Sequence, residues 1–281
     1  MAVSAGVSPA ALAGQTTLDS VAPDPNRDDL LNSPWGFTKA LASDGWATVK
    51  APFELEGDDA TVATLVMWTG LALFAFDEPI HDAVVDASES GLGRAIEDVG
   101  TFLDPVALMG NTNKYWLAGM LVSDLAGEEH LELIFKELLF SHWIAGAGRK
   151  LIGRSIGRRR PEAGLGAYSF KFWDGSSFPS GHASTITQVA AILSHHIDRW
   201  PATVLLYGLA GTVVWERVSS DAHWPSDAWI GAAWGWGVAQ VVMRRREQSA
   251  GIGPWGAVPI VDPSTGSVGF RIPLGPNPAR R

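Results

Sequence analysis

The sequence has no cysteine and no long hydrophobic run. Without cysteine the chain has no disulfide, no thiol nucleophile and no cysteine-ligated metal. A membrane-spanning helix needs roughly 18 or more mostly apolar residues, and the longest clearly apolar run, residues 60–76, has 17 without a charge. The mean hydropathy of +0.09 is also low for a chain with many spans. Two readings stay open: buried helices of a soluble bundle, or a compact membrane bundle of short helices.

Positive charge is scarce as well. The net charge of −9 argues against bulk binding of nucleic acid. Charged residues make up 18% of the chain and hydrophobic residues 46%, which excludes a disordered chain. The 31 Gly and 17 Pro follow no short period, which excludes a collagen-like chain. Thirteen Trp fit either a deep aromatic core or a belt at a membrane interface.

The pattern between residues 58 and 248 is helical, because apolar runs alternate with polar turns and period-2 alternation is rare. The expected fold is all-α, a compact bundle of about six helices with short irregular N- and C-terminal extensions. We expect an N-terminal tail and linker at 1–57, one domain at 58–248 and a C-terminal tail at 249–281. Ala11-Leu12-Ala13 is typical of a signal-peptide cleavage site, but the basic and long apolar regions of a signal are missing. A signal-peptide remnant and a plain tail both stay open.

Turn and cap residues define the expected helices. The Asp-Glu-Pro segment at 77–79 ends the first apolar helix, and Pro-Ser-Asp at 225–227 opens the last, which ends at 244–246. Between them we expect helices at 92–103, 116–125, 128–156, 183–197 and 202–218. A short β-like run follows at 258–261.

A basic cluster precedes Pro161. Six cations fall within twelve residues: Arg149, Lys150, Arg154, Arg158, Arg159 and Arg160. Cations are stabilised at the C-terminal end of a helix. The guanidinium group of arginine can also donate two parallel hydrogen bonds to phosphate oxygens. The cluster is therefore either a solvated helix end or an anion site.

The second cluster is Pro179-Ser180-Gly181-His182, directly before an apolar helix. Gly181 lets the backbone approach a ligand closely, and the free N–H groups of a helix start favour an anion. His182 could give or take a proton beside it near neutral pH. The alternative is a plain helix cap with an incidental histidine.

The third cluster is Arg217, His223 and Asp227. His223 and Asp227 are four residues apart, so on one helix they share a face. Asp227 would then accept a hydrogen bond from one imidazole nitrogen and leave the other as a nucleophile. The guanidinium group of Arg217 could bind an anion with two hydrogen bonds. The alternative is a surface ion pair at a helix start.

Together the three clusters resemble the motifs of the type 2 phosphatidic acid phosphatase (PAP2) superfamily, which includes bacterial acid phosphatases and vanadium haloperoxidases. The family pattern is Lys, six residues, Arg-Pro; then Pro-Ser-Gly-His; then Ser-Arg, five residues, His, three residues, Asp. The chain matches it at 160–161, at 179–182 and at Arg217, His223 and Asp227. The resemblance implies a PAP2/haloperoxidase-like helical bundle.

Two positions depart from this pattern. Gly153 stands where the family has its Lys, and Lys150 or Arg154 could supply the cation; we favour Arg154. Glu216 stands where the family has Ser. This carboxylate could orient Arg217 or reduce the anion affinity of the site.

The resemblance also implies a mechanism. His223 attacks phosphorus and forms a phosphohistidine, Asp227 holds the ring of His223, and His182 protonates the leaving group and then activates water. The phosphate-binding groups implied are Arg154, Arg160, Ser180, Gly181 and Arg217.

The function expected is therefore a metal-independent phosphatase acting on a phosphomonoester or on a lipid phosphate or diphosphate. The alternatives are a vanadate-dependent haloperoxidase and a weakly active anion-binding relative. We expect no metal and no cofactor, with vanadate as an inhibitor or, in a haloperoxidase, as the cofactor. His195, His196 and Asp198 suggest a polar helix end rather than a metal site.

The partners and location expected follow the same resemblance. The partners are the phosphate ester or lipid phosphate and a membrane surface, with no nucleic acid. The expected location is exported or periplasmic, soluble or membrane-associated; the alternative is an integral inner-membrane protein with its site facing the periplasm. Tyr168, Phe172, Trp173 and Trp224 lie near the motifs and could contact an apolar chain or pack in the core.

Overall fold

The computed structural model describes residues 34–175, 177–249, 258–262 and 267–271. These residues form nine α-helices, two 3-10 turns and one two-stranded hairpin. The α-helices are α1 (Pro34–Lys50), α2 (Gly57–Ala75), α3 (Asp77–Ser88), α4 (Gly91–Ala107), α5 (Met109–Ala126), α6 (Glu129–Ile156), α7 (Gly181–Ile197), α8 (Trp200–Ser219) and α9 (Pro225–Ser249). Strands β1 (Val258–Asp262) and β2 (Ser267–Arg271) pair antiparallel.

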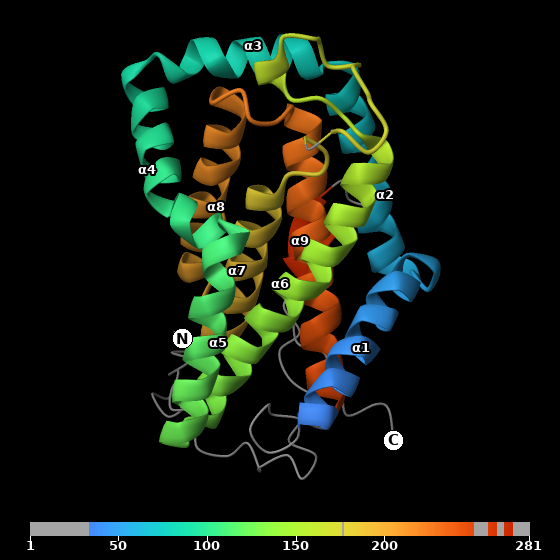
Figure 1. Cartoon of the computed structure of the whole chain (residues 1–281), viewed down its shortest axis with the longest axis vertical. Coiled ribbons are helices and arrows are strands. Elements are labelled where there is room, and N and C mark those ends of the chain that lie inside the picture. The colour runs from blue at the N-terminus through green and yellow to red at the C-terminus, as the bar shows by residue number, and fades with distance from the viewer. Residues whose placement is uncertain (1–33, 176, 250–257, 263–266, 272–281) are drawn as a thin grey trace, which may run out of the picture.

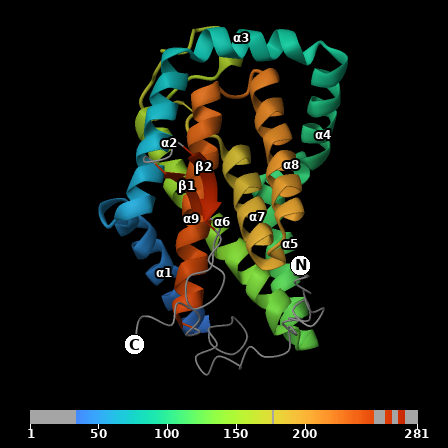
Figure 2. The same cartoon turned by 180° about the vertical axis from the view of Figure 1, so that it is seen from behind.

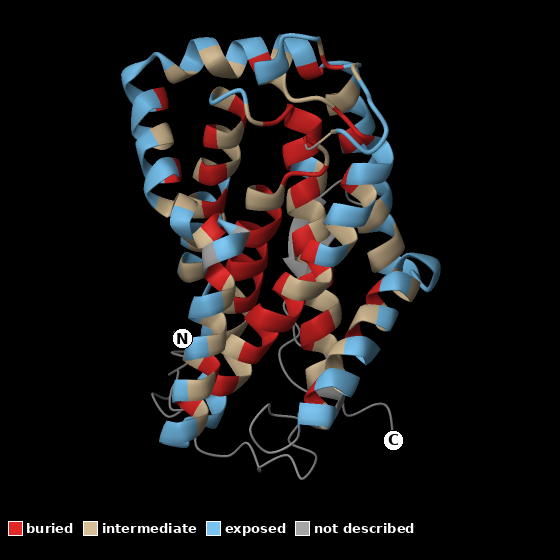
Figure 3. Cartoon of the chain, viewed as in Figure 1, coloured by how far each residue is buried: buried red, intermediate tan, exposed pale blue. Residues whose placement is uncertain are grey.

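Helix α7 is the centre of the bundle and packs against α4, α5, α6, α8 and α9 (Figure 1). Its residues 183–192 are all buried, which agrees with the concentration of buried ribbon along α7 (Figure 3). Helix α9 comes close to α7 because two of its residues lack side chains. A Cβ at Gly231 would lie 2.4 Å from the carbonyl oxygen of Ser180, and one at Gly235 would lie 2.1 Å from that of Ser184. Any side chain at these positions would push the two helices apart.

The start of α7 is defined by its own sequence. Ser180 is the N-cap residue, and its hydroxyl accepts a hydrogen bond from the N–H of Ala183 at 3.4 Å. Such a cap satisfies one of the free N–H groups of the first turn. Helix α6 ends at Ile156 and is followed by Gly157, whose φ of 68° is left-handed, as is common for the residue after a helix. The chain then makes the loop that connects α6 to α7.

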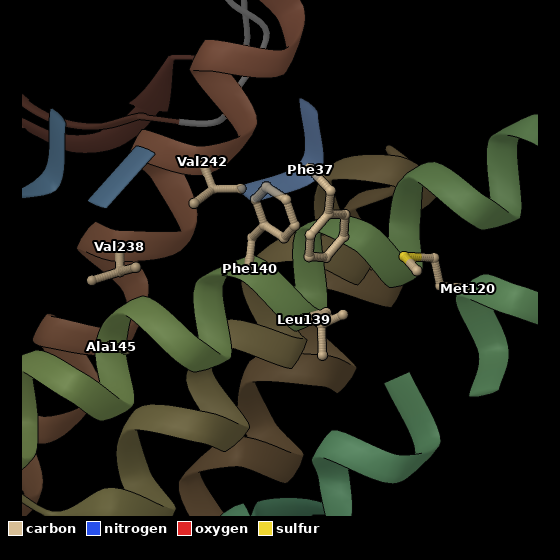
Figure 4. Packing of buried hydrophobic residues seen from close by; sticks show 7 residues of the cluster. All are labelled: Phe37, Met120, Leu139, Phe140, Ala145, Val238 and Val242. Atoms are coloured by element: carbon tan, nitrogen blue, oxygen red, sulfur yellow. The ribbon is translucent and has the colours of Figure 1, made fainter. Parts of the chain in front are cut away.

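A hydrophobic cluster joins α1, α5, α6 and α9 (Figure 4). The ring of Phe37 from α1 meets that of Phe140 from α6 edge to face, with centroids 4.8 Å apart. The cluster consists of Phe37, Met120, Leu139, Phe140, Ala145, Val238 and Val242. Because Phe37 is buried in it, the packed core begins N-terminal to residue 58.

The all-α class is confirmed, although the described part of the chain has nine helices rather than about six. The additional ones include α1 and α3. The first apolar helix, α2, ends at Ala75, just before the Asp-Glu-Pro segment, as expected. The segment itself opens α3, because proline is tolerated in the first turn of a helix. The β-like run at 258–261 is strand β1 of the hairpin, which lies beside α2 and α9 in the reverse view (Figure 2). The signal-like segment at 11–13 lies outside the described residues.

Within the described residues, no helix by itself has the length and apolar character needed to cross a membrane. Helices α2 and α3 meet these criteria only when taken as a pair, and the pair is bent by 80°.

Candidate active site

The residues of the three motifs come together at one end of the bundle. The C-terminal ends of α6 and α8 and the N-terminal ends of α7 and α9 all lie there, beneath α3 (Figure 1). Two helix N-termini with free N–H groups therefore face the same region as the arginines that end or follow α6 and α8. The arrangement is suited to an anion.

His223 is buried in the segment between α8 and α9, and its neutral tautomer is determined by the backbone. Its Nδ1 lies 2.6 Å from the carbonyl oxygen of Ser177. A carbonyl can only accept, so Nδ1 carries the proton and Nε2 keeps its lone pair. Burial, and then the charge of Arg160, lower the pKa of His223 to about 3. The ring is therefore neutral near pH 7, with its lone pair on Nε2.

Asp227 supports His223 indirectly, which corrects the expected direct hydrogen bond. Helix α9 begins at Pro225, so His223 precedes the helix and the two residues do not share a helical face. Asp227 Oδ2 instead accepts from the hydroxyl of Ser177 and, at 3.2 Å, from the N–H of Trp224. Ser177 thus links the Asp227 carboxylate to the Nδ1 of His223.

Arg158 connects this carboxylate to the start of α3. Its Nη1 donates to Asp227 at 2.8 Å, and its Nη2 donates to Asp77 at 2.6 Å. Asp77 also accepts from the N–H of Ser226 at 2.8 Å. All of these side chains are at least 98% buried, so water cannot solvate their charges and each charge depends on its protein partners. Asp77 was interpreted from the sequence only as part of a helix stop, and Arg158 only as one of six cations.

His182 lies in the first turn of α7, two residues after the N-cap residue Ser180. Its Nε2 is 3.4 Å from Oδ1 of Asp104 on α4. Burial, the largest cause, and the positive charge of Arg217, the next, lower the pKa of His182 to about 4. The carboxylate of Asp104 raises this pKa. No motif indicated Asp104, which lies 56 residues before the first Arg-Pro.

Arg217 at the end of α8 is bound by two carboxylates. Its Nε and Nη2 both donate to Glu216, and its Nη2 lies 3.3 Å from Oδ1 of Asp104. Glu216, at the family's Ser position, is buried against it. Arg160, unlike Arg217, has a buried nitrogen without an acceptor among the described residues. Its Nη1 is 3.6 Å from Glu162, but its buried Nε donates to no acceptor in the part of the chain that the structure describes.

The structure places Arg149, rather than Arg154 or Lys150, beside the start of α7. Arg154 and Lys150 are both exposed. Arg149 lies one helical turn before Gly153, and a Cβ at Gly181 would come within 3.1 Å of its guanidinium carbon. Burial and the charge of Arg160 lower the pKa of Arg149. Gly153 has no room for a side chain, because its Cβ would lie 2.6 Å from the carbonyl oxygen of Phe178.

His81 on α3 lies beside this region, because its Nε2 is 2.8 Å from Oδ1 of Asp221 and its ring is 5.2 Å from that of Trp224. Three other histidines, His130, His195 and His196, form a separate group at the C-terminal end of α7. His196 Nε2 lies 2.7 Å from the carboxylate of Glu137, and its ring meets those of His130 and His195. Among the described residues, no group of three or more His, Asp or Glu side chains is arranged to hold a metal ion. The polar helix end expected at 195–198 therefore contains a buried His–Glu pair.

The comparisons with known proteins give one family match and one similar solved structure. A sequence model of the PAP2 superfamily matches residues 135–250. No curated protein matches the chain. Among solved structures, the crystal structure of LpxE from Aquifex aeolicus is similar, with 16% identity, 60% of this chain and 95% of that chain covered, and a TM-score of 0.41. The matched segment, residues 135–250, contains all three motifs, so the similarity of this part of the chain to the PAP2 superfamily agrees with the resemblance that the motifs gave.

Proposed function

We propose that the protein is a phosphatase that hydrolyses a phosphomonoester, or a lipid phosphate or diphosphate, through a phosphohistidine at His223. The observation that carries this is the hydrogen bond from His223 Nδ1 to the carbonyl of Ser177. It leaves a neutral imidazole with Nε2 as a free nucleophile, next to three arginines that attract a phosphoryl group.

In the first step, the lone pair of His223 Nε2 attacks phosphorus, and the bond from phosphorus to the leaving oxygen breaks. His182 gives its proton to that oxygen, so an alcohol leaves rather than an alkoxide. The Asp227 carboxylate stabilises the positive charge that develops on the His223 ring, and it acts through Ser177.

In the second step, His182 takes a proton from water, and the water oxygen attacks phosphorus. The phosphorus–nitrogen bond breaks, and His223 becomes neutral again as phosphate leaves. Each of the two histidines ends the cycle in the state in which it began. The two steps need a nucleophile, a general acid, a general base and charge stabilisation, and in this proposal the chain's own residues supply all four.

The equatorial phosphoryl oxygens are held by Arg149, Arg160 and Arg217 together with the Ser180 hydroxyl and the Gly181 N–H. Such fixed positive groups provide most of the stabilisation in phosphoryl transfer. The buried, unsatisfied Nε of Arg160 supports this assignment, because buried donors normally have an acceptor.

A lipid chain is supported by exposed aromatic residues near the site. Phe172 and Trp173, in the loop between α6 and α7, are 67% and 57% exposed, and their rings lie 5.4 Å apart. Tyr168 and Trp224 serve the fold instead. The Tyr168 hydroxyl donates to the backbone at the end of α2, and Trp224 is buried. A membrane surface is the partner that this proposal implies.

The test is hydrolysis of p-nitrophenyl phosphate and of a panel of phosphatidate, undecaprenyl diphosphate, phosphatidylglycerol phosphate and soluble esters, with EDTA present. His223→Ala should lose all turnover, and His130→Ala, which changes an exposed histidine on α6, should retain it. A bromide-oxidation assay after loading with vanadate tests the haloperoxidase alternative. Full activity of His223→Ala would exclude the mechanism.

A further inference from the structure

Asp104 brings a carboxylate to His182 from outside the matched family region. It lies near the C-terminal end of α4, whereas the family match begins at residue 135. Its Oδ1 is 3.4 Å from His182 Nε2 and 3.3 Å from Arg217 Nη2. Both Oδ1 of Asp104 and Nε2 of His182 are buried, and neither forms a hydrogen bond with any residue that the structure describes. Two buried polar atoms that face each other in this way are complementary.

The other charged groups around His182 are mostly cations. Arg217, paired with Glu216, faces it from α8, Arg149 from α6 and Arg160 from the following loop, and His223 lies in the segment before α9. The three arginines disfavour the imidazolium form of His182, and Asp104 opposes them. A histidine that must donate a proton to a leaving group needs such a carboxylate in a site built from arginines.

We propose that Asp104 is a positioning residue that orients the His182 ring and favours its protonated form, so that His182 can act as the general acid. The inference rests on the proposed phosphatase function. Asp104 is itself held in place by Arg217, which Glu216 binds from the other side. The carboxylate, the arginine and the histidine thus form one connected unit across α4, α7 and α8.

The inference makes a prediction about leaving groups. Alkyl phosphates leave as strongly basic oxygens and depend on the acid, whereas 2,4-dinitrophenyl phosphate leaves without one. Asp104→Asn should therefore lower kcat for an alkyl phosphate by about 10- to 100-fold, and kcat for the dinitrophenyl ester by less than about threefold. A residue needed only for folding or for the orientation of Arg217 would slow both substrates alike.

The first measurement is independent of activity. The His182 resonance is titrated by NMR in the full-length protein, in Asp104→Asn and in Asp98→Asn, which changes an exposed carboxylate on the same helix. The pKa of His182 should fall in Asp104→Asn and stay unchanged in Asp98→Asn. An unchanged or raised pKa in Asp104→Asn would overturn the inference, even if the protein had no phosphatase activity.

The second measurement compares the two leaving groups in the same variants. A selective loss with the alkyl phosphate supports the inference. Equal loss with both esters, or faster turnover and tighter vanadate binding in Asp104→Asn, would overturn it and would show instead that Asp104 competes with the phosphoryl group for Arg217. Absence of any turnover in the wild-type protein would refute the proposed function, and the NMR titration would still decide the role of Asp104.

Discussion

Replacement of Arg149 by alanine tests whether the cation that binds phosphate lies where the structure places it or where the family pattern predicts it. The pattern places a cation at 153, where this chain has glycine, and sequence reasoning favoured Arg154 as its substitute. In the structure, the guanidinium of Arg149 lies over Gly181 at the start of α7, and Arg154 is exposed. Arg149 is therefore expected to contact the phosphoryl group.

The magnitude follows from the loss of one charge-assisted contact to a developing phosphoryl charge, about 1.5 to 4 kcal/mol. This corresponds to a decrease in kcat/KM of about 10- to 1000-fold in Arg149→Ala. Arg154→Ala and Lys150→Ala should each change kcat/KM by less than about threefold, because a solvated side chain contributes little at the site. Arg159, half-exposed and paired with Asp174 at 2.9 Å, is a further control.

The assay is steady-state hydrolysis of p-nitrophenyl phosphate by the four variants, with circular dichroism to confirm that each is folded. Activity lost in Arg154→Ala and retained in Arg149→Ala would refute the reasoning. It would mean that the end of α6 has a different register when substrate is bound.

Three further predictions follow from the same site. Glu216→Ser, which removes the carboxylate bound to Arg217, should lower the inhibition constant for orthovanadate by about tenfold, or about 1.4 kcal/mol; weaker inhibition would show that Glu216 instead orients Arg217 productively. Orthovanadate should inhibit, because it adopts the shape of the transition state, and EDTA should not; loss of activity with EDTA that a divalent metal restores would contradict the metal-free mechanism. The pKa values of His223 and His182, about 3 and about 4, lie below the ordinary value, so the unfolded chain binds more protons at acid pH. The free energy of unfolding should therefore fall as the pH drops below about 6.5, by at most about 1.4 kcal/mol per pH unit for each histidine. In urea melts at pH 7 and pH 5, His223→Gln should lose less stability than the wild type; an equal loss would show that His223 is not the source.

The long helices could be predicted from the sequence because their signals are local. The expected helix at 128–156 corresponds to α6 at Glu129–Ile156, and that at 183–197 corresponds to α7 at Gly181–Ile197. Helix α1 was not predicted, because Trp35 and Trp46 are exposed and its apolar pattern is weak. Its place in the bundle depends on the tertiary contact between Phe37 and Phe140.

The motif residues could be identified from spacing, but their contacts could not. The four-residue separation of His223 and Asp227 suggested a shared helical face, whereas Pro225 between them already indicated that the helix begins after His223. The position of Arg149 beside Gly181 and the close approach of the Phe178 carbonyl to Gly153 are tertiary contacts, which no local pattern reveals. Asp104 is distant from every motif in the sequence, and only the packing of α4 against α7 and α8 places it beside His182.

The most direct test of the central claim is to trap the covalent intermediate. The protein is mixed with a ³²P-labelled ester, quenched in alkali, in which phosphohistidine survives, and digested for mass spectrometry. The mechanism predicts an acid-labile phosphoryl group on His223, present in the wild type and absent from His223→Ala. A labelled residue other than His223, or full turnover with no trapped phosphoenzyme in any rapid-quench time course, would contradict it.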